Sequence, residues 1–210
     1  MMRTFAIYLA AAWSGFYVMG IELLGGRLLA PFFGSSVFVW GAIITVFMTC
    51  LSLGYLLGGQ LSLSKPTLAV LCALLIGEAI TATPIIALGP LTWEWLSYRV
   101  PDPRYGSLLG ALLMFGLPTV IAGMVSPYAV RLLIGSVEAS GRAAGRLYFV
   151  STFGSAAGTI LTAFYLVAWL PINTILLIFM GSTLAIAALI FALSALRQST
   201  HLVPCHAPNH

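Results

Sequence analysis

Charged residues are scarce in this chain of 210 residues. Only 7% are Asp, Glu, Lys or Arg, whereas a soluble domain carries about a quarter. Hydrophobic residues make up 60%, and the mean hydropathy is +1.06. This composition excludes an ordinary soluble domain and indicates a polytopic membrane protein. The net charge of +4 does not indicate a nucleic-acid partner, because the nine basic residues stand singly at the ends of apolar runs, as topology determinants do.

Residues that perform catalysis or bind metals are also scarce. Histidine is absent before position 201, and no Ser-His-Asp, Cys-His or metal-ligand spacing occurs within the apolar runs. No glycine-rich loop follows a strand pattern, so no nucleotide-binding domain is expected. We therefore expect no catalytic residue, no metal and no cofactor, and the chain by itself is not expected to be an enzyme.

The three cysteines do not form a disulfide framework, since Cys50, Cys72 and Cys205 have no paired spacing. Cys50 and Cys72 fall inside apolar runs and are predicted to be small buried hydrophobes. Cys205 belongs to the tail 201–210, which also holds the three histidines. Their spacing is irregular, so we expect a disordered tail without a metal site.

Apolar runs predict six membrane-spanning helices, near residues 4–29, 36–63, 66–89, 106–134, 144–169 and 172–196. Pro66 and Pro171 mark two of the breaks, because proline is tolerated in the first turn of a helix but not in its interior. The first run continues to Ile21 and is too long for a signal peptide, so we expect it to be retained. The predicted fold is an all-α integral membrane protein with one domain over residues 1–200.

Basic residues predict the orientation in the membrane. With the N-terminus in the cytoplasm, six of them lie inside: Arg3, Lys65, Arg131, Arg142, Arg146 and Arg197. Three basic residues lie outside: Arg27, Arg99 and Arg104. Four tryptophans fall at the same outer edge: Trp40, Trp93, Trp95 and Trp169. The segment Leu91–Arg99 is then either a short helix lying flat on this surface or an irregular loop with aromatic anchors. We expect a multi-pass protein of the inner (plasma) membrane with both termini in the cytoplasm.

A repeat is visible at an offset of 104 residues. Four elements match across it: Arg27–Leu29 with Arg131–Leu133, Gly41 with Gly145, Val46 with Val150, and Gly54 with Gly158. The halves, about 4–89 and 106–196, each hold three helices. Because three is odd, the halves must have inverted topology, as in many transporters. The repeat therefore predicts Arg27 and Arg131 at opposite membrane faces.

Glycines recur at four-residue spacing, which lets helices approach closely in lipid. The pairs are Gly54 with Gly58, Gly106 with Gly110, Gly141 with Gly145, and Gly154 with Gly158. They predict close helix packing, either within the chain or between copies.

Glu78 is the most deeply placed ionisable residue, near the middle of the third run. Membrane-buried acids are usually functional or paired. Protonation, or a hydrogen bond to a neighbouring Ser, Thr or backbone carbonyl, would also accommodate it. Four prolines in or beside the runs are either candidate helix breaks that line a cavity or kinks without a site, the commoner outcome for any one proline: Pro31, Pro84, Pro118 and Pro127. Glu78 is therefore a candidate intramembrane polar site.

Glu22, Arg27 and Arg131 complete that candidate site. A helix that begins near Thr4 reaches Glu22 after roughly 27 Å, near the far edge of the hydrocarbon. Glu22 and Arg27 lie about 140° apart around a helix, so each needs a partner elsewhere or the helix must unwind at Gly25–Gly26. Interfacial snorkelling is the alternative for the two arginines.

A series of motifs runs from about residue 15 to 170: Glu22–Pro31, Gly34–Ser35, Val39–Gly41, Leu53–Gly59, Gly123–Pro127 through Arg131, Gly145–Tyr148 and Ser151–Thr159. Together they resemble the membrane domain of bacterial membrane-bound spermidine synthase-like proteins. That domain is sometimes compared with part of a major facilitator fold, and it usually precedes a cytoplasmic aminopropyltransferase domain with a methyltransferase-like fold. This sequence ends shortly after Arg197 without such a domain. The resemblance therefore carries over only to membrane residues: Glu22, Arg27, Pro31, Trp40, Pro127 and Arg131.

Two functions follow as hypotheses. The resemblance implies a non-enzymatic membrane module that serves as subunit or anchor for a separate partner, either a soluble spermidine synthase-like subunit or a larger membrane complex. Alternatively, the inverted repeat with Glu22 and Glu78 suits a small transporter or binding protein for a cationic, polyamine-like solute, working as a homo-oligomer. An intramembrane enzyme is the weakest reading, because no nucleophile, base or metal set is visible.

Overall fold

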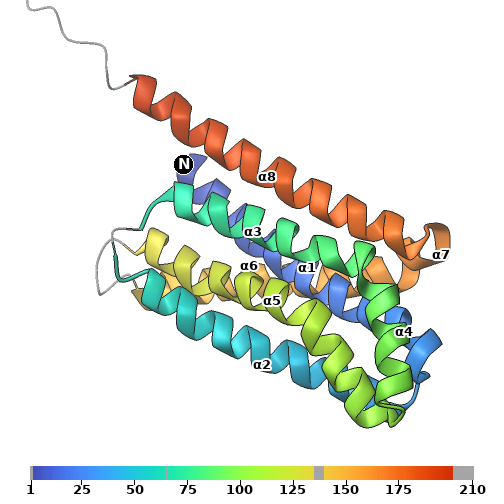
Figure 1. Cartoon of the computed structure of the whole chain (residues 1–210). Coiled ribbons are helices and arrows are strands. Elements are labelled where there is room, and N and C mark those ends of the chain that lie inside the picture. The colour runs from blue at the N-terminus through green and yellow to red at the C-terminus, as the bar shows by residue number, and fades with distance from the viewer. Residues whose placement is uncertain (1, 65, 135–139, 201–210) are drawn as a thin grey trace, which may run out of the picture.

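Six long helices run up and down between the two ends of a bundle in this computed structural model, which describes residues 2–64, 66–134 and 140–200 (Figure 1). The helices are α1 (Met2–Phe33), α2 (Val37–Leu61), α3 (Leu68–Ala87), α5 (Pro103–Leu133), α6 (Ser140–Ile160) and α8 (Ile172–Thr200). After α6 the fifth span continues through η1 (Leu161–Leu166) and α7 (Val167–Trp169). These six are long and apolar enough to cross a membrane. The predicted all-α membrane fold is confirmed, with each span within a few residues of its predicted place.

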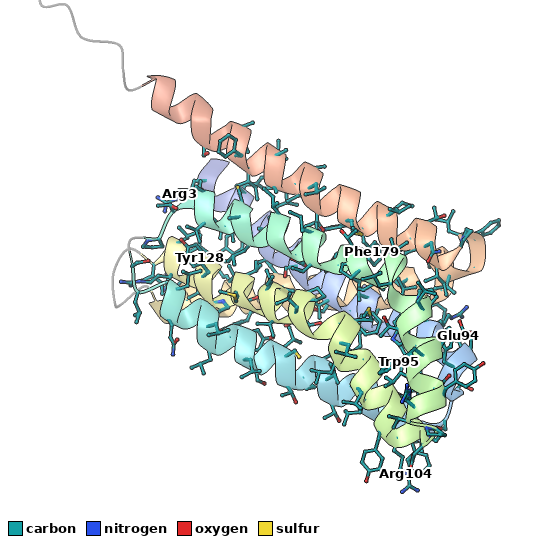
Figure 2. All side chains as sticks on the ribbon, viewed as in Figure 1. Arg3, Glu94, Trp95, Arg104, Tyr128 and Phe179 are labelled. Atoms are coloured by element: carbon teal, nitrogen blue, oxygen red, sulfur yellow. The ribbon has the colours of Figure 1, made fainter. Side chains whose placement is uncertain are left out.

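The start of α1 and the end of α8 lie at the same end of the bundle (Figure 1). Arg3 and Tyr128 lie at this end, which we call the terminal end, whereas Glu94 and Arg104 lie at the opposite end (Figure 2). An even number of spans produces this arrangement. Lys65 and the tail 201–210, including Cys205, lie outside the described residues.

Local residue chemistry explains where several helices begin and end. Gly34 has φ +79°, and its N–H donates to the Ala30 carbonyl at 2.9 Å, which ends α1 in a left-handed turn. The Asp102 side chain accepts a hydrogen bond from the Arg104 N–H at 2.9 Å and caps α5. Pro103 follows at the first helical position, where its missing N–H costs nothing.

Contacts between the helices repeat at the predicted offset of 104. Three contacts of α1 with the fifth span have equivalents between α5 and α2. Ala12–Gly154 corresponds to Gly116–Cys50, Phe16–Gly158 to Val120–Gly54, and Gly20–Thr162 to Met124–Gly58. The helices α1 and α5 run in opposite directions, since Arg3 and Tyr128 share one end while Arg104 lies at the other (Figure 2). The two halves are therefore inverted copies of one three-helix unit.

Three of the four glycine pairs make the close contacts predicted for them. A Cβ added at Gly54, Gly58, Gly154 or Gly158 would collide with the backbone of the neighbouring helix. Gly106 and Gly110 pack against Phe33 and Trp93. Gly141 and Gly145 make no such contact within the chain, because a Cβ at either would meet nothing within 4 Å. For this pair, packing between copies stays a prediction.

The predicted proline breaks are wrong. Pro31, Pro84, Pro118 and Pro127 lie inside α1, α3 and α5, and these helices continue through them. Each proline removes one backbone hydrogen bond, and packed neighbours in a membrane bundle accommodate that loss. None of the four lines the groove between α1 and α6 described below. The helix also does not unwind at Gly25–Gly26, which lie within continuous α1.

The segment after α3 is a helix, α4 (Gly89–Arg99), and not an irregular loop. Trp95 is exposed, as expected for an anchor at the membrane edge. Trp93 is fully buried, and its Nε1 donates to the Gly110 carbonyl at 3.1 Å. Its predicted place at the headgroups is therefore wrong, because Gly89 and Gly110 leave room for the ring inside the bundle.

Candidate functional site

A layer of polar side chains crosses the bundle between two apolar clusters. The cluster at the terminal end includes Ile7, Leu75 and Ile190, and the other includes Phe47, Phe115 and Phe179. Five polar residues from α1, α3 and α8 lie between the clusters or at their border: Trp13, Ser14, Tyr17, Glu78 and Thr183. We call them the mid-membrane polar layer. Polar groups at this depth are expensive, so their partners decide what the layer can do.

Glu78 is the one acidic residue in the layer. It is the eleventh of the 20 residues of α3, about 15 Å from Leu68 along the axis. Its side chain is 0% exposed, and neither carboxyl oxygen has a hydrogen-bond partner. The hydroxyl of Thr81, one turn on, donates instead to the Gly77 carbonyl at 2.7 Å. The predicted alternative of a local hydrogen bond for Glu78 is therefore wrong.

Tyr17 of α1 packs against α8, where its ring centroid lies 6.1 Å from that of Phe179. The Tyr17 hydroxyl is also buried and has no hydrogen-bond partner. A Cβ added at Gly77 would lie 3.6 Å from Ile121 of α5, so this part of α3 faces α5. Tyr17 and Glu78 thus each hold an unpartnered polar group near the mid-depth of the bundle.

The other members of the layer are paired. Trp13 Nε1 donates to Thr183 Oγ1 at 2.8 Å, and Thr183 Oγ1 donates to the Phe179 carbonyl at 2.9 Å. Ser14 Oγ donates to the Ala122 carbonyl at 3.3 Å. These bonds tie α1 to α8 and to α5. None of these hydrogen bonds involves the Glu78 carboxyl.

The polar layer lies where the two inverted halves meet. The repeat makes α1 equivalent to α5 and α3 equivalent to α8. In both of these pairs the two equivalent helices are in contact. Gly77 and Glu78 of α3 correspond to Gly181 and Ser182 of α8, since 77 + 104 = 181 and 78 + 104 = 182. The carboxyl is thus present in only one half of an otherwise repeated frame. Inverted-repeat transporters place their substrate and ion sites at this level and interface.

Glu22 forms a separate acidic position nearer the opposite end. It is 7% exposed, and its Oε2 is buried without a partner. Five residues separate it from Tyr17, or about 7.5 Å along α1. Beyond it, Gly25 packs on Phe115 and Gly26 on Trp40. The close packing of α1 encloses this carboxyl too.

The π-helical segment η1 lies beside Glu22. Residues of α1 and the fifth span that are 142 apart lie side by side, as Ala12 and Gly154 do. Since 161 − 142 = 19 and 166 − 142 = 24, η1 lies beside residues 19–24, and the two segments are in contact. The Thr162 hydroxyl in η1 is buried and has no partner. π-helical segments in α-helices are frequent at functional sites.

The four predicted site residues do not meet. Arg27 and Arg131 are both exposed and lie near the ends of α1 and α5. Because these two helices run in opposite directions, the arginines lie toward opposite ends of the bundle, as the repeat predicts. Glu22 and Glu78 are buried in different places. The sequence analysis missed Tyr17, Thr162 and the Trp13–Thr183 pair. Ser, Thr and Tyr are common in apolar runs, and only the packing of α1 on α8 and η1 distinguishes these from the rest.

In comparisons with known proteins, no family model, curated protein or solved structure matches this chain. The resemblance to spermidine synthase-like membrane domains stays a prediction. Within residues 2–64, 66–134 and 140–200, no three His, Cys, Asp or Glu side chains lie together as a metal site would require.

Proposed function

We propose that this protein binds a protonated amine at Glu78 and carries it between the membrane faces. The observation that supports the proposal is the Glu78 carboxyl, which is fully buried at mid-depth with both oxygens unpartnered. A carboxylate in such a place costs several kcal/mol unless a positive charge compensates it. A bound cation removes that cost.

The surroundings of Glu78 favour transport over a purely structural role. Ser182 occupies the equivalent position in the other half, so the fold does not need a carboxyl there. The site lies between inverted halves, which in transporters rock against each other to expose a midplane site alternately. The buried carboxyl then corresponds to an occluded state, closed to both faces. On the distribution of its arginines, we place the protein in the inner membrane with both termini in the cytoplasm.

Uptake into vesicles tests this function. The full chain is reconstituted into liposomes, and entry of radiolabelled spermidine and methylammonium is measured under an inside-negative potential. We expect uptake by the wild-type protein above that of empty liposomes. Glu78→Gln, which keeps the side-chain shape and removes the ionisable group, should abolish it.

The matched control is Glu94→Gln, because Glu94 is an exposed carboxylate of α4 at the opposite end of the bundle. Its uptake should equal that of the wild type. Thermal unfolding of each variant establishes that the protein is folded. Equal uptake by Glu78→Gln and wild type, or wild-type uptake no greater than that of empty liposomes, would refute the proposal.

A second candidate is a membrane subunit or anchor for a separate protein. The observation that favours it is the fifth span, of which 17% is buried within the chain, compared with 56% for α1 and α5. Its exposed face carries Tyr148, Phe149 and Phe153. Isolation from the native membrane in mild detergent, followed by mass spectrometry, tests this function. A stoichiometric protein partner would support it, and a protein recovered alone would count against it.

A further inference from the structure

A groove separates α1 from α6 near the terminal end of the bundle. It has a volume of about 370 Å³ and is lined by Tyr8, Gly145, Arg146, Phe149 and Val150. Ligand-binding clefts generally start at about 300 Å³. Its surface is almost entirely apolar, and Arg146 and Tyr8 are the two lining residues whose side chains end in a polar group.

The groove lies beside the contact between α1 and α6. Where the two helices touch, a Cβ at Gly154 would collide with the Ala12 carbonyl. At the groove, a Cβ at Gly145 would meet nothing within 4 Å. A side chain added at Gly145 would therefore enter open space.

The depth of the groove matches the outer part of one lipid leaflet. Arg146 lies about 9 Å from the start of α6, and Val150 about 15 Å. The guanidinium is therefore at headgroup level, and the apolar walls extend into the hydrocarbon. The register of 142 residues between α1 and α6 places Arg3 at the level of Gly145, and Arg142 lies one turn before Arg146. The three arginines thus lie within about 6 Å of one another in depth.

The other half of the repeat lacks this chemistry. Subtracting 104 from Gly145 and Arg146 gives Gly41 and Ala42, and adding 104 to Tyr8 gives Leu112. Ala42 is buried. The inverted-repeat fold therefore does not require an arginine and a tyrosine at these positions. Of the acidic residues that the structure describes, Glu22 and Glu78 are buried in the bundle, while Glu94 and Asp102 lie at the opposite end.

We propose that this groove binds one acyl chain of an anionic phospholipid, whose phosphate lies against Arg146 and the Tyr8 hydroxyl. The apolar walls accommodate the acyl chain, and the Arg146 guanidinium attracts a negative headgroup. An anionic headgroup near a membrane-surface arginine is attracted strongly enough to change binding about fivefold per arginine.

Lipid binding to the purified full chain tests the proposal. Bound lipid is counted by native mass spectrometry, and the thermal unfolding midpoint is measured with phosphatidylglycerol, with phosphatidylcholine of the same acyl chains, and with inorganic phosphate. We expect phosphatidylglycerol to bind and stabilise more than phosphatidylcholine. Inorganic phosphate should have no effect. Equal binding of the two lipids, or full stabilisation by phosphate alone, would overturn the proposal.

Three variants locate the site. Arg146→Gln should weaken phosphatidylglycerol binding about fivefold. Arg27→Gln, at an exposed arginine toward the opposite end, should leave binding unchanged. Gly145→Leu should fill the groove and abolish binding while the lipid-free protein stays folded, since the added side chain meets open space. Wild-type binding by both Arg146→Gln and Gly145→Leu would place the lipid elsewhere and refute the assignment.

Discussion

Two neighbouring glycines of α2 make opposite predictions for the same substitution. A Cβ added at Gly58 would lie 2.5 Å from the Met124 carbonyl oxygen and 2.6 Å from the Met124 Cα. These are backbone atoms, so no side-chain rotation relieves the collision, and α2 must move away from α5. A Cβ added at Gly59 would meet nothing within 4 Å. Gly58→Ala should therefore destabilise the bundle, and Gly59→Ala should not.

Overpacking in a tight interface costs about 1 to 3 kcal/mol. Replacing glycine by alanine within a helix returns at most about 1 kcal/mol. That gain is smaller in lipid, because the unfolded chain stays helical there. We expect Gly58→Ala to lower the free energy of unfolding by about 1 to 3 kcal/mol relative to Gly59→Ala.

Equilibrium unfolding in mixed micelles with increasing dodecyl sulfate measures this difference, with tryptophan fluorescence as the signal. Two glycines of α6 add a second comparison. Gly158, whose Cβ would lie 2.8 Å from the Phe16 Cα, should behave like Gly58, and Gly145 should behave like Gly59. Equal stabilities for the two members of both pairs would refute the packing argument.

Three further substitutions test other parts of the fold by the same unfolding measurement. Gly34→Ala should cost about 1 to 2 kcal/mol, because φ of +79° is unfavourable for a residue with a Cβ even where space is open. Trp93→Ala should cost about 3 to 5 kcal/mol, since it removes a fully buried ring and the bond to the Gly110 carbonyl. Tyr128→Phe should cost about 1 kcal/mol, because Thr67 N–H donates to the Tyr128 hydroxyl at 2.9 Å. No change for any one would contradict the contact on which it depends.

The helices and their repeat were predictable because both depend on local or periodic features. Span length follows from bilayer thickness and hydropathy, and glycines four apart mark one face of a helix. The match of Arg27–Leu29 with Arg131–Leu133 gave the offset at which the contacts of Gly54 and Gly158 repeat. Such features need no knowledge of which helices are neighbours.

The site was only partly predictable because it depends on packing between distant segments. Glu78 was identified as a single acid in an apolar run, but its lack of a partner is a property of the assembled bundle. Tyr17 is buried in the layer because α1 packs against α8, which no local pattern in α1 indicates. Trp93 was misplaced for the same reason, since the space for its ring is made by Gly89 and Gly110.

Chemical labelling of Glu78 tests the proposed cation site most directly. Dicyclohexylcarbodiimide reacts with protonated carboxyls in apolar surroundings, and mass spectrometry of the labelled chain identifies the modified residue. The proposal predicts that Glu78 is labelled, that Glu94 is not, and that spermidine or methylammonium slows the reaction at Glu78 in proportion to its concentration. Labelling of Glu78 at one rate with and without these cations would contradict the proposal.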